Sequence, residues 1–341
     1  MNAAPLPALV AALAVAIALL GCLDAAVRAA FPTLPRLGAN FSSAFLELEI
    51  DRAARAPART RTVVLGDSVL WGYRLRPEET APAVLARRGL PSTNLAFAGG
   101  SPANTYALVR LLLARGVRPR LVVFDVNQKT FNPADGAYAR LHPALAPLAR
   151  PLLGARDAAL LGLGGDDGGL EARIDRGVSA VWRLYALRTD LRELLFGDVD
   201  AAHALHDLLA EASGAAARER AAHVPAQEDF EGTYDLAPLR ADNVSVHFLA
   251  ATLAALRAAH VPALAILTPT NHALLHAYVD TPAYARNVAY VRTLLERGGA
   301  RVIDLDGAFA ADGFFDNDHL TARASRRFAA ALLPAIARAE R

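Results

Sequence analysis

Short apolar stretches alternate with helical patterns along most of this chain, and this alternation constrains the fold more than any other feature. Such alternation is typical of a parallel sheet covered by helices on both faces. We therefore expect a three-layer α/β/α fold around a five-stranded parallel sheet. The expected strands are 62–64, 93–97, 121–126, 263–267 and 301–305. The expected helices are 44–54, 78–88, 105–115, 244–259, 284–296 and 322–338.

The alternation lapses between residues 133 and 242, where helical patterns dominate. An insertion of this length is either a lid over a site or a surface for a partner or membrane, and the sequence does not decide. Within it, Arg183 and Arg188 accompany Trp182 and Tyr185. This group suits contact with lipid or saccharide, but an amphipathic helix explains it equally well.

The N-terminus carries no charged side chain from Asn2 to Leu23 and is long enough for one membrane span. We expect a transmembrane signal anchor over residues 1–27, a linker with a juxtamembrane helix over 28–60, and the main domain over 61–341. Two alternatives stay open: a cleaved signal peptide, and a lipoprotein in which Leu-Leu-Gly precedes the lipid-bearing Cys22. Both usually have basic residues ahead of the apolar segment, and this chain has none there.

Composition excludes some classes of function. The formal net charge of +2 gives no electrostatic reason to expect nucleic-acid binding. The single cysteine, Cys22, excludes an intramolecular disulfide and a cysteine-based metal cluster. His203 and His206 are spaced for one face of a helix, but no third ligand is evident, so we interpret them as a solvated face.

One expected strand leads directly into a helix at Gly66-Asp67-Ser68. Gly66 permits a tight turn, and Asp67 and Ser68 are residue types that cap helix N-termini. A hydroxyl there lies at the positive end of the helix dipole, where negative charge is stabilised. Ser68 is therefore either a helix cap or a nucleophile, and the motif alone leaves both open.

A second polar group, Asp316 to His319, follows the last expected strand. An Asp and a His three residues apart in a turn can face one side, so Asp316 can orient the imidazole while its other nitrogen faces a nucleophile. Alternatively, Asp316 and Asp318 cap the last helix and His319 is a surface residue. Functional residues of parallel α/β sheets gather at the carboxyl ends of strands, so we expect Ser68 and His319 to meet.

Four segments resemble, in order, the sequence blocks of the SGNH (GDSL-type) hydrolase family. Residues 66–72 (Gly-Asp-Ser-Val-Leu-Trp-Gly) resemble the first block, and residues 316–319 resemble the last. Gly99 matches the second-block glycine, although Gly100 could be aligned instead. Asn127 matches the third-block asparagine within Asp-Val-Asn-Gln, where the family usually has Gly-x-Asn-Asp.

This resemblance implies a flavodoxin-like SGNH fold and a serine esterase or O-acyltransferase that needs neither cofactor nor metal. Ser68 is then the nucleophile, His319 the general base and Asp316 its orienting acid. The oxyanion hole consists of the backbone N–H groups of Ser68 and Gly99 and the side-chain amide of Asn127.

The N-terminal span, the helical insertion and a Pro-x-Asn segment at 269–271 are similar to membrane-anchored members of the family. Those members include alginate and peptidoglycan O-acetylation proteins and the teichoic-acid D-alanyl transfer protein. The similarity implies an acylated saccharide or other ester as substrate and a membrane-bound O-acyltransferase as partner. The alternatives are a general esterase or lipase for small or lipid esters, and a catalytically inactive assembly subunit.

One expectation depends on this branch of the family. The catalytic domain is expected outside the cytoplasm, although Arg28 and Arg36 follow the span and the positive-inside rule would place that side in the cytoplasm.

Asn271 and His272 follow an expected strand at the functional edge of the sheet. Either residue is therefore expected to line the pocket, and ordinary loop capping is an alternative of at least equal weight.

Overall fold

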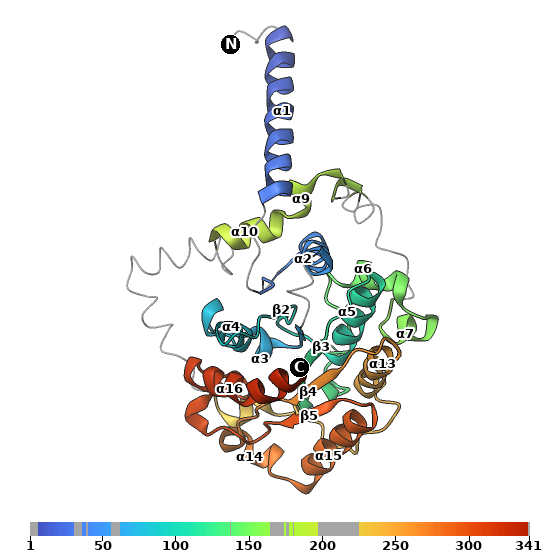
Figure 1. Ribbon diagram of the computed structural model, residues 1–341, viewed down its shortest axis with the longest axis vertical. Coiled ribbons are helices and arrows are strands. Elements are labelled where there is room, and N and C mark those ends of the chain that lie inside the picture. Colours follow the sequence, from blue (N-terminus) through green and yellow to red (C-terminus); the bar gives the residue numbers. More distant parts are fainter. Residues whose placement is uncertain are drawn as a thin grey trace.

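A computed structural model describes residues 6–30, 36–38, 40–55, 62–136, 138–163, 174, 177–179, 181–196 and 225–339. Its centre is a five-stranded sheet in the order β2-β1-β3-β4-β5 (Figure 1), and every pairing is parallel. The strands are β1 (Thr62–Leu65), β2 (Thr93–Asn94), β3 (Leu121–Val126), β4 (Ala263–Leu267) and β5 (Arg301–Asp304). The predicted α/β/α fold is confirmed, with β3 and β4 at their predicted bounds.

The central strands are short apolar runs buried along their whole length, as expected of a sheet covered on both faces. The edges differ: β5 is partly exposed, and β2 is shorter than the predicted strand 93–97. Beyond β2 the chain stays bonded to β1, since the backbone N–H of Leu95 donates to Val64 and that of Phe97 to Gly66. It then turns over the carboxyl end of β1, and this turn ends the strand early.

Two helical layers cover the sheet. Helices α5 (Pro102–Ala114) and α13 (Val244–Ala258) pack together, with α15 (Pro282–Arg297) beside α13, and α4 (Ala81–Arg87) packs on α16 (Ala322–Ala339). Their starts follow local capping: the Ser101 hydroxyl accepts from the N–H of Asn104, so α5 begins before the predicted residue 105. The Thr80 hydroxyl caps α4, and Pro77–Glu79 forms the separate turn η1, so the predicted helix 78–88 is split in two.

The remaining elements are short. They are α2 (Ser43–Arg55), α3 (Ser68–Trp71), η2 (Gln128–Phe131), α6 (Ala146–Ala149), η3 (Arg150–Leu152), α7 (Ala155–Leu160), α9 (Arg183–Ala186), α10 (Arg188–Phe196), η4 (Gln227–Phe230), α14 (His272–Val279) and η5 (Ala311–Gly313). The described parts of segment 133–242 consist of short helices and loops. His203 and His206 lie outside the described residues.

The helix α1 (Leu6–Ala30) projects from the body of the molecule (Figure 1), and its span Val10–Val27 is long and apolar enough to cross a membrane. Most of that span is exposed, but Asp24 near its end is buried. The Asp24 carboxylate accepts a hydrogen bond from the backbone N–H of Leu184 in α9. Helix α1 is therefore joined to the segment 133–242.

The segment after α1 is more than a linker. Leu37 and residues of α2, including Phe45 and Ile50, are buried in the main hydrophobic core. Arg36 lies over the Trp71 ring and donates to the Gly72 carbonyl. This segment therefore packs directly against the helix α3, which carries Ser68.

The strand order creates a crevice. In this order, the connection after β1 leads to β2 on one side, and the connection after β3 leads to β4 on the other side. In sheets of this kind, ligands bind at the carboxyl ends of the two strands where the direction changes. Ser68 follows β1, and Asn127 follows β3. The sheet topology thus places both residues at one switch point.

We expect Gly66→Ala to destabilise the fold by about 2 kcal/mol or more. Gly66 has a φ of +147°, and a Cβ atom there would lie 2.2 Å from Oδ1 of the buried Asp125. Denaturant unfolding of the full chain in detergent measures the loss. Gly154→Ala is the matched control, because Gly154 has a φ of −69° and open space around its Cβ direction. Equal losses for the two variants would contradict the packing argument.

Candidate active site

The turn from β1 into α3 presents Ser68 at the first position of a helix. Asp67 is the N-cap, since its Oδ1 accepts a 2.8 Å hydrogen bond from the N–H of Val69. The carboxylate of Asp125 on β3 accepts from the N–H of Asp67, at 3.0 Å for Oδ1. Burial, and next the Asp67 charge, raise the pKa of Asp125 well above its usual value, so the neutral form is favoured beneath the turn.

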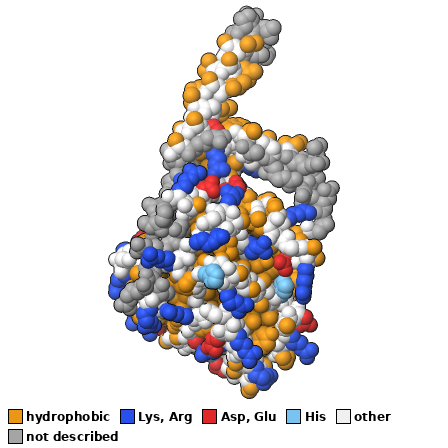
Figure 2. Space-filling view, turned by 45° about the vertical axis from the view of Figure 1, so that its right-hand side comes forward, with side chains coloured by type: hydrophobic (Ala, Val, Ile, Leu, Met, Phe, Trp, Pro, Cys, Tyr) orange, Lys and Arg blue, Asp and Glu red, His pale blue; other side chains and the backbone are white. Residues whose placement is uncertain are grey.

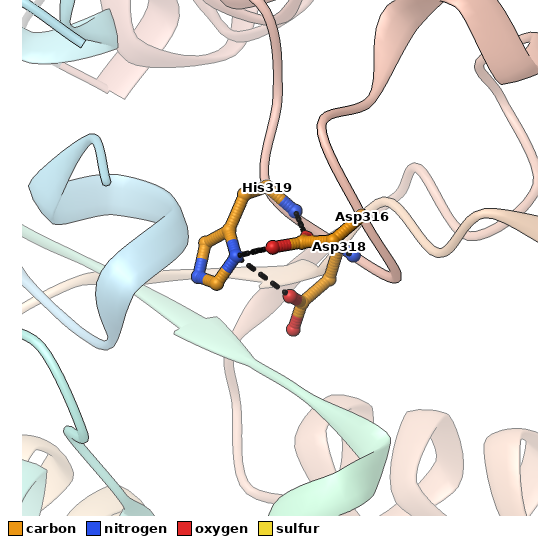
Figure 3. Close-up of side chains that lie close together, drawn as sticks. All are labelled: Asp316, Asp318 and His319. Atoms are coloured by element: carbon orange, nitrogen blue, oxygen red, sulfur yellow. Dashed lines mark hydrogen bonds and ion pairs between the residues drawn. The ribbon is translucent and has the colours of Figure 1, made fainter. Parts of the chain in front are cut away.

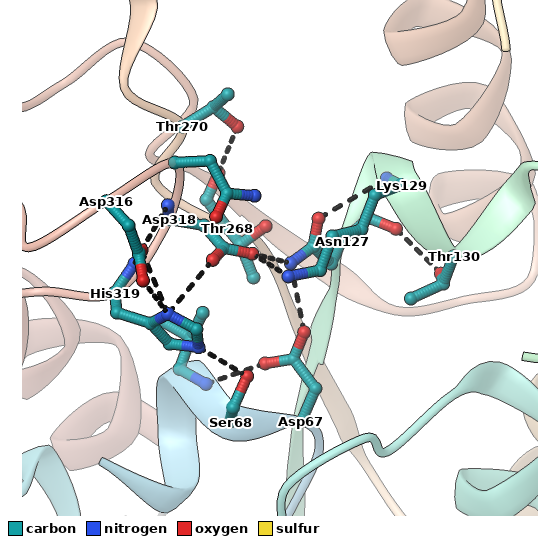
Figure 4. A network of polar contacts seen from close by, with 12 residues as sticks. Asp67, Ser68, Asn127, Lys129, Thr130, Thr268, Thr270, Asp316, Asp318 and His319 are labelled. Carbon is teal, nitrogen blue, oxygen red and sulfur yellow. Dashed lines mark hydrogen bonds and ion pairs between the residues drawn. The ribbon is translucent and has the colours of Figure 1, made fainter. Parts of the chain in front are cut away.

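The structure brings Ser68, His319 and Asp316 together from distant parts of the chain (Figure 4). The Ser68 Oγ lies 2.8 Å from His319 Nε2. The Nδ1 of the same ring lies 2.7 Å from Asp316 Oδ2 and 2.9 Å from Oδ1. A hydroxyl, an imidazole and a carboxylate in this order form the nucleophile, base and orienting group of a serine triad.

A second carboxylate approaches the same ring nitrogen. Figure 3 shows Asp316 and Asp318 both directed at Nδ1 of His319, and Asp318 Oδ1 lies 3.5 Å from it. Burial lowers the pKa of His319, but the hydrogen bond to Asp316 and the charges of both carboxylates outweigh it, so the pKa is raised above its usual value. In Asp316, burial raises the pKa, but the hydrogen bonds from His319 outweigh burial, so the pKa of Asp316 is below its usual value.

The loop that carries Asp316 is held from behind by Asn271. The Asn271 side chain donates to the Asp316 carbonyl at 3.0 Å, and its N–H donates to the Asn317 carbonyl at 2.8 Å. Its Oδ1 also accepts from Leu274 as the cap of α14. His272 contacts Asp280 and Asp306 through its two ring nitrogens. Both residues therefore have structural contacts, and pocket lining stays a prediction for them.

Two backbone N–H groups remain available as hydrogen-bond donors. Among the described residues, neither the N–H of Ser68 nor that of Gly99 donates to a backbone carbonyl. Gly100 differs, because its N–H donates to the Phe97 carbonyl and a Cβ atom there would lie 2.3 Å from the Gly66 carbonyl oxygen. Gly100 thus allows the loop to pack on the turn before Ser68, and the predicted choice of Gly99 over Gly100 as an oxyanion donor stays a prediction.

Asn127 reaches the site, but its amide hydrogens have other partners. Its Nδ2 donates to Asp67 Oδ2 at 2.9 Å and to Asp318 Oδ2 at 2.6 Å. An oxyanion would have to replace one of these carboxylates as acceptor. The predicted role of Asn127 in the oxyanion hole therefore stays a prediction, and in this structure the residue bridges two acidic side chains.

Sequence reasoning gave no role in the site to Lys129 or Tyr73 and considered Asp318 only as a helix cap. Lys129 forms a close ion pair with Asp318, whose side chain is fully buried. The ring of Tyr73 lies 4.4 Å from that of His319, centroid to centroid. Lys129 had one signal in the sequence, since it is the only lysine in the chain. The contacts of Asp318 and Tyr73 depend on tertiary packing and had none.

One group of side chains among the described residues has the spacing of metal ligands. Donor atoms of Asp316, Asp318 and His319 lie within 4.8 Å of one another. Asp318 is already paired with the Lys129 ammonium, and Asp316 is already hydrogen-bonded to His319. A cation would have to compete with the Lys129 ammonium, so the donor set fits a hydrogen-bonded triad better than a metal centre.

No family model matches the chain, and no curated protein matches its sequence. Among solved structures, a protein assigned to the lipolytic G-D-S-L family from Desulfitobacterium hafniense DCB-2 has 10% identity, covers 81% of this chain and 98% of its own, and has a TM-score of 0.39. A protein assigned as an acylhydrolase, from Bacteroides fragilis NCTC 9343, has 11% identity, covers 87% of this chain and 98% of its own, and has a TM-score of 0.42. An alpha/beta hydrolase enzyme from the metagenome of Lake Arreo, Spain, has 13% identity, 82% and 95% coverage, and a TM-score of 0.35. Likenesses this weak carry no conclusion about the activity of this chain.

The raised pKa of His319 predicts a pH-dependent contribution to stability. A histidine whose folded pKa exceeds its unfolded value, about 6.5, stabilises the fold below that pH and loses this contribution as pH rises through the folded pKa. The excess stability of wild type over His319→Gln is therefore expected to be larger at about pH 5.5 than at about pH 8.5, by about 1.4 kcal/mol per unit of pKa difference.

Denaturant unfolding of both proteins at the two pH values measures this difference. Asp316→Asn serves as the control: without the carboxylate that raises the pKa most, the pH dependence is expected to shrink. An excess stability that grows with pH would contradict the assigned contacts of His319.

Proposed function

We propose that this protein is a serine-dependent acyl-ester hydrolase or O-acyltransferase of the SGNH type, acting through an acyl-serine on esters of bacterial envelope or exopolysaccharides. The observation that carries the proposal is the 2.8 Å contact between Ser68 Oγ and His319 Nε2, with Asp316 on the other ring nitrogen. This arrangement favours an active enzyme over an assembly subunit with a decayed site, since each member of the triad is present and bonded to the next.

Acylation follows from the geometry. Ser68 Oγ attacks the ester carbonyl carbon while its proton passes to His319 Nε2, and Asp316 holds Nδ1–H and stabilises the imidazolium. The N–H groups of Ser68 and Gly99 donate hydrogen bonds to the developing oxyanion, and each such donor is typically worth about 3 kcal/mol in the transition state. When the intermediate collapses, the carbon–oxygen bond to the alcohol breaks and His319 returns the proton to that alcohol.

Deacylation repeats these steps with a second hydroxyl group. Water or a saccharide hydroxyl attacks the acyl-serine, His319 takes its proton, and Ser68 leaves as the restored alcohol. Water gives hydrolysis, and a sugar hydroxyl gives acyl transfer. The triad chemistry is the same in both cases, so the acceptor is decided by what binds beside the acyl-serine.

The apolar span in α1 supports a membrane-tethered form of the enzyme. We place the catalytic domain outside the cytoplasm, where envelope polymers are modified, with a membrane-bound O-acyltransferase as the donor of acyl groups in the transfer reaction. Arg36 favours the opposite orientation by the positive-inside rule, so the topology has its own test below.

Ser68→Ala is expected to abolish labelling by a fluorophosphonate probe and to lower hydrolysis of p-nitrophenyl acetate at least about 1,000-fold, because the nucleophile is removed. Intact mass spectrometry measures the adduct. Ser92→Ala is the matched control, since the Ser92 hydroxyl is buried without a hydrogen-bond partner in the part of the chain that the structure describes, and it is expected to be labelled like wild type. A folded wild-type protein that takes no label would overturn the proposed activity.

Hydrolysis and transfer are separated by supplying an isotopically labelled acyl donor with and without an oligosaccharide acceptor. Transfer is expected to give acylated sugar in wild type and none in Ser68→Ala. Release of free acid alone, at a rate unchanged by the sugar, would instead support a general esterase. Rapid hydrolysis restricted to long-chain esters would support a lipase.

A reporter at the C-terminus tests the topology. Alkaline phosphatase fused after the last residue is expected to be active, since this enzyme folds only outside the cytoplasm. A fluorescent protein that matures in the cytoplasm serves as the paired control. Signal from the second reporter alone would overturn the envelope location.

A further inference from the structure

The catalytic histidine has two carboxylates at the same ring nitrogen, but only one makes a hydrogen bond to it. Asp316 lies at hydrogen-bond distance from Nδ1 of His319, whereas the nearer oxygen of Asp318 lies at 3.5 Å. That oxygen, Oδ1, has no hydrogen-bond partner among the described residues although it is buried. A buried carboxylate oxygen without a partner is costly, so something must restrain Asp318 from moving onto the ring.

The restraint lies on the other oxygen of Asp318. Oδ2 accepts from the ammonium of Lys129 and from Asn127 Nδ2. The Lys129 side chain is 12% exposed and that of Asp318 is 0% exposed. Burial lowers the pKa of Lys129, but the charges of Asp318 and Asp67 raise it above its usual value, so the lysine stays protonated.

We propose that Lys129 is a positioning residue that holds Asp318 off His319 and so selects Asp316 as the orienting acid of the triad. Two effects act together. First, the ion pair fixes the direction of the Asp318 side chain. Second, the positive charge of Lys129 offsets the negative charge of Asp318, which would otherwise keep His319 protonated at neutral pH and so make the ring a weaker base catalyst. This proposal rests on the proposed function for its catalytic meaning, but its geometry can be tested without turnover.

The other groups around His319 bear on its titration. Ser68 and Tyr73 contact the ring from α3 and the residues that follow it, and Asp67 joins the network through Asn127. Tyr138 and Tyr234 interact electrostatically with Lys129. Burial raises the pKa of Tyr138 to about 12 and that of Tyr234 further, so both stay neutral near pH 7.

The test is a titration of the full chain with 13C-labelled histidine, followed by NMR in detergent micelles, with the His319 signal assigned by its loss in His319→Gln. In Lys129→Met the proton affinity of His319 is expected to rise about tenfold or more, and in Asp318→Asn to fall by a similar factor. The double variant removes both charges and is expected to titrate near wild type. It also keeps the test valid if the single lysine variant leaves a buried charge that prevents folding.

Rate measurements separate positioning from a general structural role. In Lys129→Met the acidic limb of the kcat/KM profile is expected to move to higher pH, because His319 must be neutral to accept the serine proton. A purely structural lysine would lower the rate at every pH and leave the NMR titration of His319 unchanged. Unchanged titration in both single variants overturns the proposal, whether or not Ser68 proves to be a nucleophile.

A second and independent inference concerns the surface at the foot of α1. Helices α9 and α10 lie at this end of α1 (Figure 1), and the hydrogen bond from the N–H of Leu184 to Asp24 joins α9 to α1. Arginine side chains gather directly below the projecting helix (Figure 2). Any membrane that α1 crosses would therefore end close to these two helices.

This surface combines exposed apolar, aromatic and cationic side chains. Val181 is 76% exposed and Leu194 is 46% exposed. The rings of Trp182 and Tyr185 stack at 5.9 Å, and the Arg188 guanidinium lies 4.0 Å from the centre of the Tyr185 ring. Aromatic rings beside arginine, with aliphatic side chains directed outward, are the composition of segments that lie in a membrane interface.

We infer that the α9–α10 surface, made of Val181, Trp182, Tyr185, Arg188 and Leu194, lies against the headgroups of an anionic bilayer. Charge supports this choice of partner: a hollow of about 800 Å³ beside the surface is lined by Arg150, Arg183 and Arg188, with Glu47 as its acidic residue. Arginine near a membrane surface is attracted to anionic lipid. The catalytic domain is then held at two points, by α1 and by this surface.

The chain supplies its own reporter, because it has two tryptophans and the other, Trp71, is buried at the end of α3. In lipid nanodiscs that contain phosphatidylglycerol and brominated phosphatidylcholine, emission of the full chain is expected to be quenched. Trp182→Phe leaves only Trp71 and is expected to show little quenching. The double variant Arg188→Glu with Arg192→Glu is expected to reduce the quenching when the lipid is anionic.

Unquenched emission from wild type in the disc would overturn this inference and would indicate that water or a protein partner covers the surface. A chain that does not enter the disc overturns it as well. Neither result depends on the chemistry of Ser68.

Discussion

The parallel pairing of β1 with β3 is the constraint on which the candidate site depends. It brings the residues after two strands to one edge of the sheet, although they are far apart in the chain. The pairing also carries Asp125 under the turn that presents Ser68, and Gly66 leaves the space that this carboxyl needs. Ser68 is thus positioned mostly by backbone geometry and buried contacts, whereas its hydroxyl contact to the ring depends on the loop of His319.

Carboxylates crowd around one serine, and the structure accommodates each of them differently. Asp125 is fully enclosed, and burial favours its neutral form. Asp316 shares its charge with His319, and Asp318 shares its charge with Lys129. Burying an acid is costly unless it is neutralised or paired, so a change at any one partner is expected to redistribute protons among the others.

Much of the architecture follows from sequence patterns. The apolar runs of β3 and β4 predict buried strands because short continuous apolar runs are typical of a sheet covered on both faces. Capping residues likewise place the helix starts within a few residues. The resemblance of separate blocks also identifies three residues that the structure brings within hydrogen-bond distance. The pairing of Lys129 with Asp318 was not predictable, because it joins side chains 189 residues apart and depends on tertiary packing. The short β2 depends likewise on a turn over its neighbour.

The packing of residues 36–55 has a practical consequence for anyone who removes the apolar helix α1 from the chain. Arg36 donates to backbone carbonyls around Gly72, and the Trp71 indole donates to the Leu37 carbonyl. A truncation placed at the expected domain start near residue 61 would delete these contacts and expose the apolar face that Phe45 and Ile50 cover. The shortened chain should therefore begin before Arg36, so that the packing around the turn of Ser68 is retained when α1 is removed.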